Sequence, residues 1–367
     1  MNWQGSLSPY LRPTFLLLKK RRIACLPVAG KDNPYQLLMM QGLNQSGQLE
    51  AISGVHDKFF GIIRTGLRFR PDYIHFDWES SYYYRKSLLL TLLSIPVFLA
   101  QILFCRWFMN ISLVWTPHNL RPHDLGNAGL HRLVRRIFAS QMDWIRLFSH
   151  RSLTAAAEEF KQAETRFRIV PEGSYKAYYP EYAIGKTAAT LREELGIPPN
   201  HKVLLYLGLI KPYKGLTELL TAFHRLDPRD TTLLIAGKSM QEAYFRELSD
   251  AASAGRNVCI REGFVQEAEL PAWYQLASAV VLPFRKIENS GSVIMAMGYK
   301  KAILAPAMGV LPDRLCRQPQ LLYHEGPEEA LSVFATLSQE ELAEIGEANF
   351  AELEKYKWED YASCFIR

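Results

Sequence analysis

Residues 203–223 read VLLYLGLIKPYKGLTELLTAF, and this stretch decides the fold. Residues 203–207 are an uncharged apolar run, which is typical of a strand buried on both faces. Gly208 ends the strand, and a short basic loop leads to Gly215. Apolar residues then recur at helical spacing, at Leu216, Leu219, Leu220 and Phe223. The stretch therefore predicts a strand, a glycine turn, a loop and a helix.

The loop carries two lysines, Lys211 and Lys214, between the strand and the helix. Open parallel sheets bind ligands at the carboxyl ends of their strands, and helix N-termini favour anions. We therefore expect a phosphate-bearing ligand at this point. The alternative is an ordinary turn with two solvated lysines, and the loop alone favours the functional interpretation only slightly.

The segment GLIKPYKGL resembles the donor-phosphate loop of GT-B glycosyltransferases of the family 4 type, G-x-(I/L)-x-x-x-K-G. In that family a Lys or Arg and the Lys before Gly hold the diphosphate of a nucleotide-sugar. The resemblance implies an α/β protein with two Rossmann-like, doubly wound parallel-sheet domains that face a cleft. It extends over roughly residues 110–305, through the segments TPHN and RIVPEGSY and through residues 279–304.

Residues 279–304, AVVLPFRKIENSGSVIMAMGYKKAIL, contain a polar loop that opens a helix. Free N–H groups at such a helix start can be capped by Ser or Asn, or can bind phosphate. The family places two glutamates eight residues apart here, but this chain has Ile287 and Met295 at those positions, with Glu288 one place off. A branch of the family with S-G-x-x-x-x-A matches better. The class of donor is thus better predicted than its identity.

The residues that we expect at the donor follow the strands of the second half of the chain. They are Gly208, Lys211, Lys214, Gly237, Lys238, Glu262, Glu288, Asn289, Ser290, Gly291 and Ser292. The nucleotide-diphosphate sugar is a co-substrate, and no cofactor is expected. We also expect no metal, because no D-x-D follows a strand.

The first half of the chain supplies the other candidates. The strand before TPHN ends at Trp115, and His118 follows it. In the family this His lies under the donor sugar, although a lone His is more often structural. The candidate catalytic residues are His118, Asp77, Glu79 and Asp124. The alternative is that the carboxylates have no catalytic role and are simply solvated groups on half-buried strands. The candidate acceptor-binding residues are Asn33, Tyr35, Asn119, Arg121 and Glu172.

The charge of the chain is uneven. Residues 1–180 carry 23 Lys and Arg against 12 Asp and Glu, a balance of +11, whereas residues 181–367 carry 20 against 25, a balance of −5. A basic half predicts an anionic partner, and the absence of a nucleic-acid motif favours a membrane or an anionic acceptor. The expected contacts are residues 19–22 and a basic helix over residues 130–148 with Arg132, Arg135, Arg136 and Arg146.

Residues 87–105 are nineteen uncharged residues, a length that borders on a transmembrane span. Pro96 and the polar Thr91, Ser94 and Gln101 argue against spanning. The sequence predicts a crossover helix partly exposed to lipid, and a fully buried helix is the alternative.

The sequence predicts an N-terminal acceptor domain over residues 1–180 and a C-terminal donor domain over residues 181–338, with a helix in residues 339–367 that packs back onto the first. Five scattered cysteines and no evident signal peptide favour the cytoplasm, or the inner face of its membrane. The expected activity is sugar transfer from a UDP-sugar, or next from GDP-mannose, to a saccharide or lipid-linked glycan. A non-catalytic nucleotide-sugar or glycan-binding protein and a Rossmann-like sugar-nucleotide epimerase are the alternatives.

Overall fold

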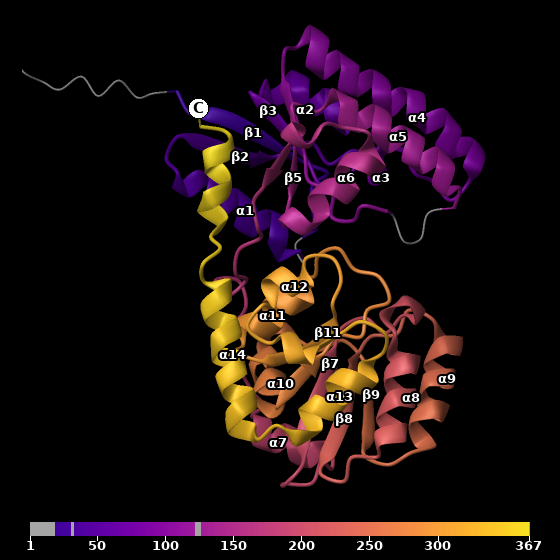
Figure 1. Cartoon of the computed structure of the whole chain (residues 1–367). Helices are drawn as coiled ribbons and strands as arrows, with labels where there is room; N and C mark the ends of the chain where they lie inside the picture. Colours follow the sequence, from indigo (N-terminus) through magenta and orange to yellow (C-terminus); the bar gives the residue numbers. More distant parts are fainter. Residues whose placement is uncertain (1–18, 31–32, 122–125, 367) are drawn as a thin grey trace, which may run out of the picture.

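The computed structural model describes residues 19–30, 33–121 and 126–366. The chain forms two α/β domains, one above the other in Figure 1, and each is built around a six-stranded sheet. Every strand pair is parallel, and helices connect the strands. The predicted doubly wound, two-domain architecture is confirmed.

The sheet of the N-terminal domain has the strand order β2-β1-β3-β4-β5-β6. Its strands are β1 Arg21–Leu26, β2 Leu49–Ser53, β3 Tyr73–Phe76, β4 Ser112–Trp115, β5 Trp144–Leu147 and β6 Phe167–Ile169. Its helices are α1 Pro34–Gln45, α2 Gly61–Phe69, α3 Ser80–Tyr83, α4 Leu88–Leu103, α5 Ala128–Gln141 and α6 Leu153–Phe160, and a π-helical turn, η1 Phe104–Phe108, extends α4.

The sheet of the C-terminal domain has the order β12-β11-β10-β7-β8-β9. Its strands are β7 Lys202–Leu207, β8 Thr231–Gly237, β9 Val258–Glu262, β10 Ala279–Val281, β11 Ala302–Pro306 and β12 Leu322–Tyr323. Its helices are α7 Ala188–Glu194, α8 Leu216–Leu226, α9 Glu242–Ser253, α10 Leu270–Leu276, α11 Gly291–Gly298, α12 Leu311–Arg314 and α13 Pro327–Thr336. The apolar residues of α8 lie buried on one face, as their spacing predicts.

The last segments of the described chain run along both domains, in yellow in Figure 1. The helix α14 Gln339–Leu353 begins with a capping box between Ser338 and Glu341. It is followed by a 3-10 segment, η7 Trp358–Cys364, which packs against α1. Trp358 is buried, stacks on Tyr175 at 6.1 Å between ring centroids, and donates from Nε1 to the Ser174 carbonyl at 2.8 Å. This segment joins the C-terminal domain to the N-terminal one.

The prediction of a single basic helix over residues 130–148 is wrong. The helix α5 ends at Gln141, and the strand β5 begins three residues later. The Asp143 carboxylate accepts a hydrogen bond from the Leu113 amide at 2.7 Å, while the Asp143 amide donates to the Leu113 carbonyl, and these bonds start the pairing with β4. Arg146 therefore lies on a buried strand and is itself fully buried.

We predict that Trp358→Ala destabilises the protein by about 3–5 kcal/mol, because it leaves a cavity at the junction of the domains. The measurement is the unfolding midpoint in urea, read by circular dichroism. Trp107→Ala is the control, since Trp107 is 70% exposed. Equal losses in the two variants would contradict a domain-joining role for Trp358.

Candidate functional site

A cavity of about 250 Å³, here called the cleft cavity, lies between the two domains. The N-terminal domain and the segment that leaves it contribute Asn33, Tyr35, Trp78, His118, Asn119, Glu172 and Tyr175. The C-terminal domain contributes Tyr213, Lys214, Lys286, Ile287, Asn289 and Gly291. Candidates for acceptor, sugar and diphosphate binding, which lie far apart in the sequence, thus line one space.

Two glycines allow the loops of the C-terminal domain to approach one another. Gly237 has a φ of +152°, and a Cβ there would lie 1.8 Å from the Gly208 carbonyl oxygen. Gly215 has a φ of +75°, and a Cβ there would lie 1.9 Å from the Pro283 carbonyl oxygen. Any other residue at these positions would strain the backbone and push the loops after β7, β8 and β10 apart.

Lys214 ends the 3-10 turn η4 Pro212–Lys214 at the start of α8. Its Nζ lies 4.6 Å from the centroid of the Phe284 ring. Burial and, to a lesser degree, the charge of Lys211 lower the pKa of Lys214 to about 8. In the described part of the chain, no carboxylate forms an ion pair with Lys214. A half-buried cation that lines the cleft cavity without a carboxylate partner in the described residues is suited to an anionic ligand.

The helix α11 begins at the same cavity. Its N-cap residue, Ser290, is buried, but its side chain makes no capping hydrogen bond, and Gly291 lines the cavity. The N-terminal N–H groups of such a helix are a favourable site for phosphate oxygens. The diphosphate expected from the sequence would therefore lie between Lys214 and the start of α11.

Glu172 connects the two domains beside this helix start. Its carboxylate accepts hydrogen bonds from the Tyr175 hydroxyl and from the Asn289 side-chain amide. Its backbone carbonyl accepts from Nη2 of Arg314 at 2.7 Å. Because the side chain is 2% exposed and already bonded on both oxygens, Glu172 acts as an organiser of the Asn289 loop in this structure.

Asp77 and His118 form a hydrogen-bonded pair, and His118 lines the cleft cavity. Nε2 of His118 lies 3.1 Å from Oδ1 of Asp77, and Nε2 of Gln36 donates to Oδ2 at 3.0 Å. Burial alone would raise the pKa of Asp77, but His75, His118 and Gln36 hold it below its ordinary value. Burial also lowers the pKa of His75 to about 4, so His75 is neutral at physiological pH. The bonds from His118 and Gln36 are then what keep the Asp77 carboxylate ionised.

Aromatic rings fix the orientation of His118. Its ring stacks on Trp78 at 4.7 Å and 16°, and meets the edge of Tyr35 at 4.7 Å and 81°. In the neutral form of His118, an ionised Asp77 accepts a hydrogen bond from Nε2–H, and Nδ1 then carries no proton. His118 therefore presents a hydrogen-bond acceptor, which is also a base, while its ring is clamped on two sides.

The other two catalytic candidates are placed differently. Glu79 is buried outside the cleft cavity, where Nε of Arg135 lies 2.9 Å from Oε1 and Nε1 of Trp115 donates to Oε2 at 3.2 Å. These bonds give Glu79 a structural role, because breaking a buried ion pair is costly. Asp124 lies outside the described residues.

A second hollow of about 250 Å³, the strand-end cavity, lies at the carboxyl ends of β7, β8 and β9. Of the predicted donor residues it is lined by Gly208, Gly237, Lys238 and Ser292. Glu262 is exposed and does not line it, whereas the next residue, Gly263, does. The sequence did not single out Phe264 and Tyr274, which supply aromatic surface to this cavity.

A wider hollow of about 590 Å³, the outer hollow, adjoins the cleft cavity and shares Asn119, Tyr213, Lys286 and Ile287 with it. Arg121 lines it and forms an ion pair with Glu159, at 3.0 Å between Nε and Oε2. Glu288 also lines it, accepts a hydrogen bond from the Ser152 hydroxyl, and has a pKa raised by burial. Lys211 lies near the diphosphate loop, with Nζ 5.7 Å from the Tyr213 ring centroid.

The sequence also missed Trp78, Tyr175, Tyr213 and Lys286 as lining residues of the cleft cavity. Trp78 directly follows Asp77 at a strand end, and Tyr213 lies inside the diphosphate loop. Their positions beside predicted site residues were the available signal. Lys286 is in the loop before α11, where the resemblance drew attention to the glutamate positions instead.

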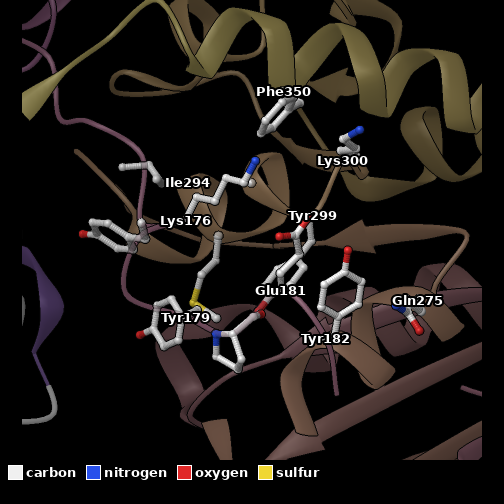
Figure 2. A pocket seen from close by; sticks show the side chains of 13 residues that line it. Lys176, Tyr179, Glu181, Tyr182, Gln275, Ile294, Tyr299, Lys300 and Phe350 are labelled. Atoms are coloured by element: carbon white, nitrogen blue, oxygen red, sulfur yellow. The ribbon is translucent and has the colours of Figure 1, made fainter. Parts of the chain in front are cut away.

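Figure 2 shows a further hollow, of about 290 Å³, between the segment that joins the domains and the helices α11 and α14. Lys176 and Lys300 point toward Phe350, each with Nζ 5.2 Å from its ring centroid. Tyr179 and Met295 line both this hollow and the strand-end cavity. In the described residues, no group of three or more His, Cys, Asp or Glu side chains is arranged to hold a metal ion.

Comparison with known proteins agrees with this geometry. The family model for glycosyl transferases group 1 matches residues 188–331. GDP-mannose:glycolipid 4-beta-D-mannosyltransferase of Xanthomonas campestris pv. campestris is 25% identical over 252 residues, which cover 69% of this chain and 66% of that protein. Lipopolysaccharide 1,2-N-acetylglucosaminetransferase of Salmonella typhimurium is 29% identical over 270 residues, which cover 70% of this chain and 66% of that protein.

The matches to these two relatives thus span just under two thirds of their length. Among solved structures, sucrose-phosphate synthase from Thermosynechococcus elongatus superimposes with a TM-score of 0.69 at 16% sequence identity, covering 94% of this chain and 97% of that one. This likeness confirms the predicted fold over both domains.

We predict that Lys214→Ala weakens the binding of nucleoside diphosphates by roughly 1.5–3 kcal/mol, the contribution of one charge-assisted contact. The measurement is isothermal titration calorimetry, with circular dichroism to show that the fold is retained. Lys86→Ala is the control, because Lys86 is exposed and lines neither the cleft cavity nor the strand-end cavity. Unchanged affinity in Lys214→Ala would contradict the diphosphate site.

Binding should also depend on pH. The pKa of Lys214 is lowered to about 8, so the free protein loses this positive charge as the pH rises through 8. We expect affinity for the diphosphate to be highest below pH 8 and to fall above it. Lys214→Arg, which stays charged, should flatten this fall. An identical fall in both proteins would show that another group is responsible.

Proposed function

We propose that this chain, which has the GT-B fold and matches the group 1 glycosyl transferase model over residues 188–331, is a glycosyltransferase that moves a sugar from a nucleotide-diphosphate sugar to a saccharide or lipid-linked glycan. One observation carries the proposal: Lys214 and the start of α11 line the same cavity as His118, whose Nε2 is bonded to Asp77. Lys214 and the start of α11 suit a diphosphate, and His118 suits the sugar that the diphosphate carries.

In this proposal the diphosphate binds to Lys214, Lys211 and the N-terminus of α11. The leaving diphosphate gains negative charge in the transition state, and these groups are already oriented to offset it. We propose that they do so without a metal ion. The nucleoside would occupy the strand-end cavity, whose aromatic residues Phe264 and Tyr274 offer surface to a base.

For the donor we favour a UDP-sugar, with GDP-mannose next. The strand-end cavity, of about 250 Å³, offers aromatic surface to the base of either donor. GDP-mannose stays as the second candidate, because the name of the Xanthomonas relative specifies it.

The acceptor would enter through the outer hollow, which opens beside the cleft cavity and is the largest of these hollows at about 590 Å³. The names of the two relatives specify a glycolipid and a lipopolysaccharide as acceptors. We propose a lipid-linked glycan for this chain too, met at the cytoplasmic face of a membrane in exopolysaccharide or glycolipid synthesis. Asn119 and Arg121 are the acceptor contacts that this entry would use.

His118 is the residue that we place at the reacting sugar. With Nε2 donating to Asp77, its Nδ1 can accept a hydrogen bond from a sugar hydroxyl or the proton of the attacking hydroxyl. Both roles need the neutral ring that an ionised Asp77 orients. Asp77 is thus a positioning residue, because it is 1% exposed and reaches the substrate only through His118.

The first test separates transfer from mere binding. We predict that the protein releases UDP or GDP from one sugar nucleotide when a glycan acceptor is present, and that EDTA does not abolish this release. The measurement is a coupled assay of nucleotide release over a panel of UDP-sugars and GDP-mannose, with mass spectrometry of the acceptor. Binding with no turnover on any acceptor would favour the non-catalytic alternative, and an epimerised sugar nucleotide would favour the epimerase.

The second test compares two buried carboxylates that follow the same strand. We predict that Asp77→Asn lowers kcat about 10²-fold or more, with little change in the KM for the donor, because the amide no longer fixes the tautomer of His118. Glu79→Gln should instead lower the melting temperature, through the loss of the pair with Arg135, and leave kcat nearly intact. Full turnover in Asp77→Asn would contradict the role given to His118.

A further inference from the structure

The helix α4 is apolar on the face that it exposes, whereas the face that it buries is partly polar. The residues that it buries against the domain include the polar Thr91, Ser94 and Gln101. The residues that it exposes are apolar: Leu88, Leu89, Leu92, Leu93, Val97 and Leu103 are each between 38% and 66% exposed. A soluble protein normally turns the apolar stripe of a helix to its core, so the outer face of α4 is built for apolar surroundings.

The buried polar groups dock α4 firmly to the domain. Nε2 of Gln101 donates to the Phe59 carbonyl at 2.7 Å, and Oε1 of Gln101 accepts from the Ile63 amide at 3.2 Å. The Thr91 hydroxyl donates to the Arg85 carbonyl at 3.1 Å. Leu88–Phe108 is long and apolar enough to cross a membrane, and only 28% of its apolar window is buried. The hydrogen bonds of Gln101 and Thr91, however, hold one side of α4 against the N-terminal domain.

The apolar surface continues beyond α4. Phe59 and Phe60 precede α2, and Trp107 and Phe108 follow α4 in η1 with exposures of 70% and 80%. We call these residues and the exposed side chains of α4 the α4 surface. In Figure 1 the helix α4 lies along the outer edge of the N-terminal domain, away from the C-terminal domain. The surface is therefore free to meet a partner while the cleft is in use.

The charges around the α4 surface are mainly positive. Residues 58–71 and 80–123 contain no Asp or Glu. The basic residues of these segments are Lys58, Arg64, Arg68, Arg70, Arg85, Lys86, Arg106 and Arg121. Three guanidinium groups lie against rings of the surface: Arg64 at Phe60, Arg85 at Phe59 and Arg106 at Trp107. Asp57 is paired with Arg64, and Asp143 lies 3.3 Å from Arg106. Exposed leucine and aromatic residues within a mainly basic rim complement a lipid layer with anionic headgroups.

A groove of about 200 Å³ opens in this surface between α4 and the start of α2. Leu90, Leu93 and Val97 form one wall, and Phe59, Phe60 and Tyr82 form the other. Arg85 lies at its side, with its guanidinium 4.7 Å from the Phe59 ring centroid. An acyl chain in the groove would have apolar contacts along its length and a cation close to its headgroup.

The basic contacts expected from the sequence are less suited to a membrane. Arg135 is buried and paired with Glu79, so it cannot reach a surface. Arg132 pairs with Glu159 at 2.7 Å, and Nε of Arg136 donates to the Glu159 carbonyl at 2.8 Å. Part of the positive balance of this half is thus used inside the domain, and the α4 surface is the better candidate.

We propose that the α4 surface docks the protein onto an anionic lipid bilayer, with α4 lying in the plane of the interface and not across it. The proposal rests on the proposed function in one respect, since a lipid-linked acceptor would lie in the same membrane. It specifies the orientation: the N-terminal domain is the membrane-facing one, and the C-terminal domain is held in the water phase.

The test is cosedimentation of the full chain with vesicles of phosphatidylcholine alone and of phosphatidylcholine with 30% phosphatidylglycerol. We expect binding to the anionic vesicles that salt weakens. The double variant Leu89→Gln/Leu93→Gln should bind at least about tenfold more weakly, because two apolar side chains no longer enter the interface. Ile184→Gln/Leu226→Gln is the matched control, since these residues are 72% and 40% exposed elsewhere and should bind as wild type.

A depth measurement checks the orientation. Lipids with a quenching group on the acyl chain should reduce the fluorescence of the wild type, and Trp107→Phe should lose most of this quenching while it still binds. Equal binding of the leucine variant and its control, or no binding to anionic vesicles, would overturn the proposal. So would a dimer that the leucine variant converts to a monomer, because a second copy would then cover the surface.

The proposal and the enzymatic function fail separately. Nucleotide release with a soluble glycan acceptor should be the same in Leu89→Gln/Leu93→Gln and in wild type, because these residues lie away from the cleft. If the protein binds vesicles but uses no sugar nucleotide, the docking proposal is supported and the proposed function is contradicted. If transfer occurs and vesicles do not bind, the reverse holds.

Discussion

The guanidinium of Arg146 is the interaction on which the shape of the cleft depends. It is fully buried on β5, donates to the carbonyls of Val170 and Pro171 at 2.9 and 3.0 Å, and donates to the Tyr35 hydroxyl at 3.2 Å. Its fourth contact is the ring of Tyr361, at 4.1 Å from the centroid. Arg146 therefore holds three segments together. They are the segment that leaves the N-terminal domain after β6, the start of α1, and η7 near the end of the chain. A buried cation without an ion pair is tolerated only when its donors are satisfied, and here carbonyls, a hydroxyl and an aromatic face do so.

The consequence reaches the substrates through Tyr35. Arg146 holds its hydroxyl, and the Tyr35 ring in turn meets His118 edge-on and Trp358 at 5.5 Å. His118, Tyr35 and the C-terminal segment with Trp358 therefore share one packed cluster. The donor side is fixed in another way, by glycines that let strand-end loops touch. The N-terminal side of the cleft is thus shaped by side-chain packing, and its C-terminal side by the close approach of backbone segments.

The sequence predicted the donor half well because that half is local. A buried strand, a glycine turn, a lysine pair and a helix are consecutive in residues 203–223, so period and turn chemistry suffice to place them. The acceptor half depends on contacts between distant segments. Arg146 was expected on a helix because the residues before it have helical spacing, and only the pairing of β5 with β4 reveals a strand. The separation of Asp77 from Glu79 was not predictable either, since it depends on which partner each carboxylate meets, His118 or Arg135.

Glu172 forms hydrogen bonds that join the two domains beside α11. The family pattern places glutamates in the loop before α11 and on the helix, where this chain has Ile287 and Met295. A carboxylate nonetheless reaches that loop from the other domain, because Glu172 accepts from Asn289 directly before the helix start. Its second oxygen is held by Tyr175, which stacks on Trp358. The N-terminus of α11 is thus positioned by residues of the joining segment and of the C-terminal return, so the geometry of the diphosphate site depends on the angle between the domains.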